Sequence, residues 1–235
     1  NANTPLASII TALIVALTVM FLTPLFYCLP QACLAAIIVM AVSSLLDFAT
    51  LKRLWIYNRA DALAWISAFL AVLITSVEKG ILFGAAVSIL LHLWRTSKPH
   101  IAVVGRVGNS EHFRNFLRHE VKTFPHVLAV RVDASLYFVN TKYLEDYLLK
   151  ALNDRPEVKY LLLVCSAVNS IDGSALETLK SLILDLNNRG IEFYMSEVKG
   201  PVMDGLLKIG FVEELGKDHI FLTTDQAMRF LECGN

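Results

Sequence analysis

The sequence predicts a multi-domain protein, with an all-α membrane part over residues 1–97 followed by an α/β domain over residues 98–235. The distribution of charge is the first observation behind this division. The first part holds five basic and three acidic residues, whereas the second holds 16 basic and 18 acidic ones. The second observation is the pattern after residue 98, where short apolar strands alternate with amphipathic helices, as in α/β folds.

The overall composition excludes several classes of function. Lys plus Arg and Asp plus Glu number 21 each, so the net charge is zero and there is no basic excess for nucleic acid. Hydrophobic residues make up 55% of the chain. The four cysteines lack CxxC spacing and the histidines are scattered, so we expect no metal site, no cofactor and no disulfide framework.

The run from residue 1 to 46 carries no charged residue and is long enough for two membrane helices of about 20 residues each. We expect spans at 6–22 and 29–46, separated by a break that Pro24 and Pro30 mark. The run begins with Asn and has no basic region before it. We therefore expect the sequence to start inside a larger membrane protein.

Two further spans are expected at 62–77 and 80–94. Glu78 and Lys79 separate them, and a mid-bilayer charge costs about 2.5–3.5 kcal/mol. A tight hairpin with both charges at the membrane surface is therefore favoured over one long helix.

The segment 47–61 has the pattern of an interfacial helix, because apolar side chains recur every three or four residues among charged ones. A plain loop with some aromatic residues is the alternative. We expect four membrane-interface anchors at the helix ends: Trp55, Arg59, Trp94 and Arg95. The basic residues fall on one side of the predicted spans. The positive-inside rule therefore places 47–61 and everything after residue 95 in the cytoplasm of a multi-pass cell-membrane protein.

Because strands alternate with helices in the second part, we expect parallel pairing with right-handed crossovers. Its strands are predicted at 101–104, 127–132, 136–138, 160–165, 191–195 and 220–222. Its helices are predicted at 141–152, 174–186, 202–209 and 225–231.

The chain contains no phosphate-binding glycine motif and no nucleophile–base set, so no catalytic residue is predicted and we expect no enzyme. The loop 169–176 is the exception, because it links an apolar strand to a helix with a capping-box start, Ser174 to Glu177. Asp172, Gly173 and Ser174 form the candidate site there. Composition alone leaves two interpretations, a contact for an anion or protein partner and a plain capped helix.

Two strings together carry a family resemblance: Arg131-Val-Asp133-Ala-Ser-Leu-Tyr-Phe138-Val-Asn140 and Ser170-Ile-Asp172-Gly173-Ser174-Ala175-Leu176. They resemble the STAS domain of SulP anion transporters, a domain named for sulfate transporters and anti-sigma-factor antagonists. Gly105-Arg106-Val and Asn58-Arg59-Ala-Asp61-Ala62 also resemble that family's domain junction and its penultimate membrane hairpin. The resemblance covers essentially the whole chain.

The resemblance implies secondary active transport of an inorganic anion, sulfate first and bicarbonate or a dicarboxylate next. The coupling ion would be H+, Na+ or a counter-anion, in symport or antiport. Family members have 14 segments in two inverted repeats, of which this chain would hold the last four, and they are commonly homodimers. Their anion lies between two half-helices, so the main substrate-binding residues are expected upstream of residue 1.

The cytoplasmic STAS domain would regulate transport and contact a protein partner. Anti-sigma-factor antagonists carry a phosphorylatable serine directly after the loop aspartate, where this chain has Gly173. Ser174 is the weaker candidate for phosphorylation. The alternative function is a membrane-tethered STAS signalling module, in which the spans, embedded in membrane lipid, serve only as an anchor.

Overall fold

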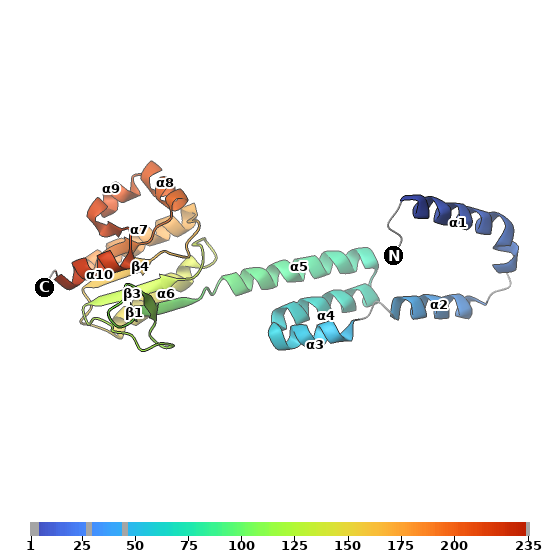
Figure 1. Cartoon of the computed structure of the whole chain (residues 1–235), viewed down its shortest axis with the longest axis horizontal. Coiled ribbons are helices and arrows are strands. Elements are labelled where there is room, and N and C mark those ends of the chain that lie inside the picture. Colours follow the sequence, from blue (N-terminus) through green and yellow to red (C-terminus); the bar gives the residue numbers. More distant parts are fainter. Residues whose placement is uncertain (1–4, 27–29, 44–46, 234–235) are drawn as a thin grey trace. The chain divides into compact units, whose positions relative to one another are not determined.

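The computed structural model of the protein describes residues 5–26, 30–43 and 47–233. The chain divides into two compact units, Asn1–Gly80 and Ile81–Asn235, so that helix α5 contributes to both. Figure 1 colours the ribbon along the sequence, with the helical unit in blue to teal. The predicted domain boundary between residues 97 and 98 is a boundary of composition, and it stays a prediction.

The first helices follow the predicted apolar segments closely. Their bounds are Pro5–Phe26 (α1), Gln31–Ser43 (α2), Phe48–Tyr57 (α3), Arg59–Ile74 (α4) and Val77–Thr96 (α5). Helix α1 continues past Pro24 to Phe26, and α2 begins directly after Pro30. Among the described helices, α5 is long and apolar enough by length and composition to cross a membrane. The apolar segments Ser8–Phe21 and Gln31–Met40 are shorter. Parts of the predicted span 29–46 lie outside the described residues.

Side chains of the chain itself cap α3 and α4. The Asp47 carboxylate accepts a hydrogen bond from the Thr50 amide at 2.9 Å, which starts α3. Asn58 ends α3 by donating its own amide to the Leu54 carbonyl, and its side-chain oxygen accepts from the Ala60 amide at 3.1 Å. The predicted segment 47–61 is therefore helical, but Asn58 divides it into the whole of α3 and the start of α4.

The reversal between α4 and α5 lies at residues 75–76, immediately before Glu78. Glu78 and Lys79 fall within the first turn of α5 instead of in a loop, and the membrane hairpin stays a prediction. Gly80 packs directly on Val72 of α4, because a Cβ added at Gly80 would lie 2.6 Å from the Val72 Cα atom. A small residue is required at this contact.

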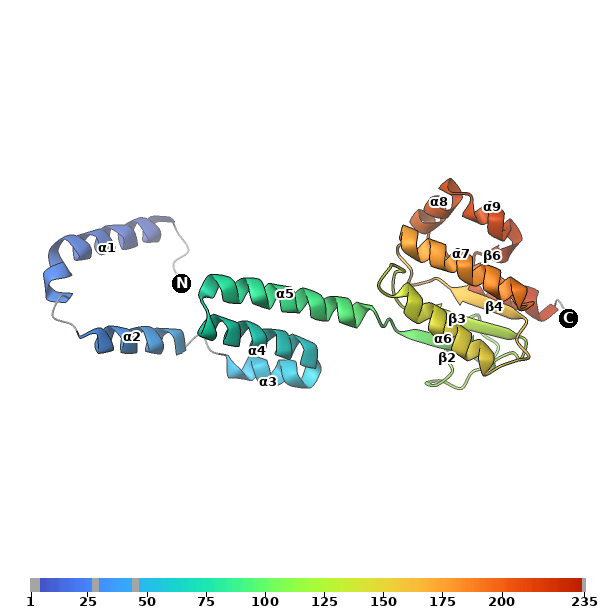
Figure 2. The ribbon, with the colours of Figure 1, turned by 180° about the vertical axis from the view of Figure 1, so that it is seen from behind.

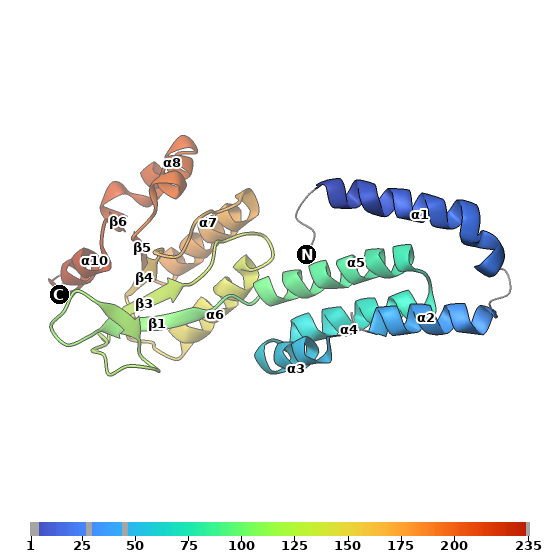
Figure 3. The same ribbon diagram turned by 45° about the vertical axis from the view of Figure 1, so that its right-hand side comes forward.

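Within the described residues of the second unit, six strands form one sheet in the order β2-β1-β3-β4-β5-β6. Their bounds are Ile101–Arg106 (β1), Phe113–Asn115 (β2), Val127–Val132 (β3), Tyr160–Val164 (β4), Glu192–Ser196 (β5) and Ile220–Phe221 (β6). Strands β3 to β6 are parallel, and β1 is antiparallel to both of its neighbours. Figure 3 shows the strands from β1 to β6 fanned across the unit.

Two apolar layers cover the sheet. Its helices are Thr141–Asn153 (α6), Gly173–Asn188 (α7), Gly200–Lys208 (α8), Phe211–Leu215 (α9) and Thr224–Cys233 (α10). A short 3-10 turn, Lys217–His219, precedes β6. Helices α6 to α9 bury apolar side chains with one face of the sheet, and α10 packs on the other face. Figure 2 shows α6 and α7 side by side.

The predicted strand 136–138 is wrong. Leu136 makes one isolated parallel bridge with Ile171, and the chain then turns because the Tyr137 amide donates to the Asn140 side-chain oxygen at 3.1 Å. Strand β2 and helix α9 were not predicted, since each is five residues long or less. The expected parallel pairing holds for β3 to β6 but not for β1 and β2.

Candidate functional site

Asp172 is the N-cap of α7. Its Oδ1 atom accepts a hydrogen bond from the Ala175 amide at 2.7 Å. The capping box predicted from Ser174 is therefore wrong, because α7 begins at Gly173 and Ser174 already lies in its first turn. Asp172 was available as a cap two residues earlier, and Asp and Ser are comparably good at this position. Ser174 and Gly173 are exposed.

Asp172 also joins the loop before α7 to the segment after β3. Its second oxygen, Oδ2, accepts from the Phe138 amide at 2.9 Å, and its own amide donates to the Leu136 carbonyl at 3.0 Å. The fully buried Asn140 holds the same segment by donating to the Ser135 carbonyl at 2.8 Å. The two strings singled out in the sequence thus form one hydrogen-bonded unit.

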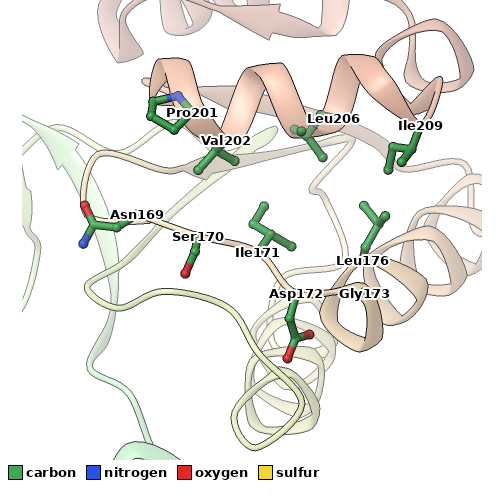
Figure 4. A pocket seen from close by; sticks show the side chains of 11 residues that line it. Asn169, Ser170, Ile171, Asp172, Gly173, Leu176, Pro201, Val202, Leu206 and Ile209 are labelled. Atoms are coloured by element: carbon green, nitrogen blue, oxygen red, sulfur yellow. The ribbon is translucent and has the colours of Figure 1, made fainter.

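A cavity of about 400 Å³ lies between this loop and α8. Its residues come from the loop, the start of α7 and one face of α8: Asn169, Ser170, Ile171, Asp172, Gly173, Leu176, Pro201, Val202, Gly205, Leu206 and Ile209. Figure 4 shows the side chains of Ile171, Leu176 and Leu206 pointing into the space, whereas the carboxylate of Asp172 points away from it. The cavity is therefore walled mainly by apolar groups.

This arrangement suits a protein contact better than an inorganic anion. Both carboxylate oxygens of Asp172 are occupied by backbone amides, and its negative charge already interacts with the positive end of α7. Phe138 lies beside the loop with 69% of its surface exposed. On α8, Lys199 at the N-cap position donates to the Asn169 side chain at 2.6 Å, which ties the two walls of the cavity together.

A second charged cluster lies where β1 begins. Arg131 donates to Asp133 through Nε at 2.6 Å and Nη2 at 3.1 Å, and His100 Nδ1 is 2.7 Å from the same carboxylate. Partial burial by itself would raise the pKa of Asp133, but the hydrogen bonds from Arg131 and His100 outweigh it and lower that pKa. The hydrogen bond to Asp133 in turn raises the pKa of Arg131. The carboxylate is therefore charged at neutral pH.

The last helix is attached to the first strand by an ion-pair network. Arg106 of β1 forms an ion pair with Asp225 of α10, and its other nitrogen is 3.4 Å from Glu232. Arg229 also donates to Asp225, at 2.7 Å. The Gly105-Arg106 string of the sequence therefore has a structural role in closing the domain.

The four predicted membrane-interface anchors lie at helix ends. Trp55 is in the last turn of α3, and Arg59 is the first residue of α4. Trp94 and Arg95 are in the last turn of α5, where Trp94 is 63% exposed and the Lys98 amine lies 5.7 Å from its ring centre. These positions fit interfacial anchors, and their contact with lipid stays a prediction.

In the part of the chain that the structure describes, side chains form no metal-binding cluster, and the cysteine of the STAS domain core is buried. No three metal-ligating side chains converge there. The thiol of Cys165 is buried, and burial raises its pKa to about 12, so it is protonated and unreactive at neutral pH.

The sequence matches two protein families, the Sulfate permease family over residues 1–68 and the STAS domain over residues 118–227. Among curated relatives, it is 32% identical to Sulfate transporter 1.1 of Arabidopsis thaliana over 97% of this chain and 37% of the relative. It is 33% identical to Probable sulfate transporter 4.2 of the same plant, over 97% of this chain and 36% of the relative. The chain thus spans a little over a third of these relatives, which are named as transporters and not as enzymes.

The fold resembles that of a solved anion transporter. The murine Solute Carrier 26 family member A9 in its inward-facing state has a TM-score of 0.82 and 22% identity, covering all of this chain and 38% of the other. At this identity the likeness shows a shared fold.

Proposed function

Because this chain belongs to the SulP family, as its C-terminal portion with the STAS domain, we propose that the whole protein is a secondary active transporter of an inorganic anion. The observation that carries the proposal is the alignment with named sulfate transporters over 97% of the chain, across both units. Sulfate is accordingly the first candidate anion, ahead of bicarbonate or a dicarboxylate. We propose a homodimer on the same family grounds.

In this proposal, α1, α2, α4 and α5 correspond to the last four of the family's 14 segments. Helix α5 carries the chain from the bilayer into the STAS domain. The basic residues Arg95 and Lys98 follow its apolar stretch, and the positive-inside rule assigns that end to the cytoplasm. Only three residues lie between Thr96 and His100, so the STAS domain is held close to the membrane surface.

The STAS domain would regulate transport through the loop 169–174. Its apolar cavity and the exposed Phe138 offer a surface for a protein segment, and Asp172 fixes the loop geometry through two amides. Ser174 is exposed in the first turn of α7, and a phosphate there would add about 1.5 to 2 negative charges beside Asp172. The flux experiment described next distinguishes the candidate coupling ions, which are H+, Na+ and a counter-anion.

The test of transport is flux into proteoliposomes that contain the full-length protein carrying this chain. Radiolabelled sulfate should accumulate above the level of protein-free vesicles under one of three gradients, inward H+, inward Na+ or outward bicarbonate. Collapse of that gradient should abolish the uptake. If sulfate, bicarbonate and dicarboxylates all fail to cross under every gradient, the transporter proposal is wrong and the tethered signalling module becomes the better account.

A matched pair of variants tests whether the loop 169–174 and its cavity regulate transport. Ile209→Ser places a hydroxyl in the cavity wall, whereas Leu222→Ser makes the same kind of change at an exposed residue outside it. The first should change the flux measured in cells that contain the partner, and the second should not. Equal flux for both variants would contradict a regulatory contact at this cavity.

A further inference from the structure

A basic pocket lies at the sheet edge formed by β1 and β2, on residues that the proposed function does not use. The pocket has a volume of about 330 Å³. We define it by the basic residues that line it together with one carboxylate: His100, Arg114, Arg118, His119, Arg131 and Asp133. Three guanidinium groups and two imidazoles thus surround a single negative charge.

Strand register places this pocket at the end of the domain that the chain enters from α5. Strand β1 starts at Ile101, which pairs with Val132, so Asp133 comes to lie beside His100 and donates its amide to the His100 carbonyl at 3.0 Å. Strand β2 runs antiparallel to β1 and therefore returns toward the same end. The turn after β2 then brings Arg118 into the pocket wall.

The three guanidinium groups of the pocket differ in whether a carboxylate pairs with them. Arg131 is held in a fork by Asp133, as described above. By contrast, the side chains of Arg114 and Arg118 have no ion pair or hydrogen bond with any residue that the structure describes. The single carboxylate is already shared between Arg131 and His100, so two positive charges are left to face the pocket. Arginine forks suit phosphate oxygens, which accept two parallel hydrogen bonds.

The short covalent connection to α5 favours a lipid headgroup as the source of a phosphate bound in the pocket. His100 lies four residues after Thr96, a reach of at most about 14 Å at roughly 3.3–3.6 Å per residue. If α5 crosses the bilayer, the pocket lies within reach of lipid headgroups. Arg95 and Lys98 extend the positive charge toward that surface. Basic clusters immediately beside the cytoplasmic end of a membrane helix attract anionic lipids.

The turn that carries Arg118 also presents apolar side chains to the outside. Leu117 is 77% exposed, and Phe116 before it lies against the Arg155 guanidinium, 5.7 Å from ring centre to carbon. Alternation of basic and large apolar residues is typical of segments that lie in a membrane interface. The turn 116–119 therefore has the composition needed to rest on the lipid surface while the arginines bind headgroups.

We propose that the basic pocket binds the phosphate headgroup of an anionic membrane lipid and so docks the STAS domain on the cytoplasmic leaflet beside α5. The proposal rests on the membrane setting of the proposed function, but not on transport itself. Each basic residue near an anionic surface contributes about fivefold to binding. Loss of both unpaired arginines should therefore weaken docking about thirtyfold.

The experiment uses the full chain in nanodiscs and measures amide hydrogen exchange over residues 114–119. Discs of phosphatidylcholine alone are compared with discs that also contain phosphatidylglycerol. We expect exchange to slow in the anionic discs and to return to the phosphatidylcholine rate in R114Q/R118Q. The control K150Q/K208Q loses the same charge from exposed residues of α6 and α8 and should behave like the wild type.

Three results would overturn the proposal. Exchange could be the same in both kinds of disc. The control variant could lose protection as fully as R114Q/R118Q, which would mean that total charge and not the pocket is responsible. Inorganic phosphate added to phosphatidylcholine discs could give the full protection, which would assign the pocket to a free anion. Sulfate flux is a separate readout, so protection without flux would contradict only the transporter proposal, and flux without protection only this one.

Discussion

Large apolar side chains are mostly exposed in the membrane part of the chain and mostly buried in the STAS domain. In the membrane part, Ile74 of α4 is 78% exposed, whereas in the STAS domain Leu163 of β4 is fully buried. Both are large aliphatic residues in regular structure. Under the proposed function this difference follows from the solvent, because a lipid-facing helix exposes its apolar side chains to lipid, whereas an α/β domain buries them in its own core. The same residue type is therefore evidence of packing in one part and of surface in the other.

Truncation of one apolar side chain in each part should give the largest difference in stability. Leu163→Ala should destabilise the STAS domain by about 2–5 kcal/mol, because it leaves a cavity in a closed core. Ile74→Ala should change the opening free energy of α4 by under about 0.5 kcal/mol. Hydrogen exchange of β4 and α4 amides in nanodiscs measures both. Equal effects would mean that α4 is packed against protein.

The membrane part also contains close packing, at the contact between Gly80 and Val72. Gly80→Ala should destabilise the α4–α5 reversal by about 1–3 kcal/mol, since the new Cβ would press on the Val72 backbone. Gly205→Ala in α8 meets no atom within 4 Å and should stabilise that helix by about 0.4–1 kcal/mol. Exchange rates in the two helices should therefore move in opposite directions.

Capping of α7 is expected to matter less than core packing. Asp172→Ala removes acceptors from the Ala175 and Phe138 amides and should cost about 0.5–2 kcal/mol. Ser174→Ala makes a change of similar size in the exposed first turn and should lie within about 0.5 kcal/mol of the wild type. Urea unfolding followed by exchange of the α7 amides separates the two variants. A larger loss for Ser174→Ala would restore the capping box predicted from the sequence.

The smallest expected effect is the pH dependence of the cluster formed by His100, Arg131 and Asp133. The folded pKa of Asp133 is lowered, so its contribution to stability is complete above the ordinary aspartate pKa near 4 and is lost as the pH falls through the lowered value. The stability difference between wild type and Asp133→Asn should therefore shrink as the pH falls below about pH 4. A difference that persisted at pH 3 would show that the carboxylate does not stabilise through its charge.

Sequence patterns predicted the elements with a strong period or a long apolar run. Strand β4 and helix α7 are examples, because a continuous apolar run and a 3.6-residue period both extend over whole elements. The patterns failed where tertiary contacts decide. Strand β2 is only three residues long, and it forms because it pairs with Gly105 and Arg106 of β1. The segment after Leu136 does not continue as a strand, because the hydrogen bond to the Asn140 side chain turns the chain there.

One part of the candidate site was predictable from the sequence, and the other part was not. Asp172 could be found from its place between an apolar strand and an amphipathic helix, but its second bond, to the Phe138 amide 34 residues earlier, could not. The basic pocket was missed altogether. The alternation of basic and apolar residues around Arg114 and Arg118 was a local signal, yet only the antiparallel register brings them to His100.

The bond between Arg106 and Asp225 joins residues 119 positions apart in the chain, and this separation bears on how the protein is made. Ribosomes add roughly 5–20 residues per second, so about 6–24 s pass between the synthesis of the two partners. If α5 crosses the bilayer as proposed, the first strand is attached to an inserted helix during that interval, while the helix that carries Asp225 is still being translated. Under that proposal, the domain would complete its sheet several seconds after membrane integration, and chaperones and proteases could reach the incomplete sheet in the meantime.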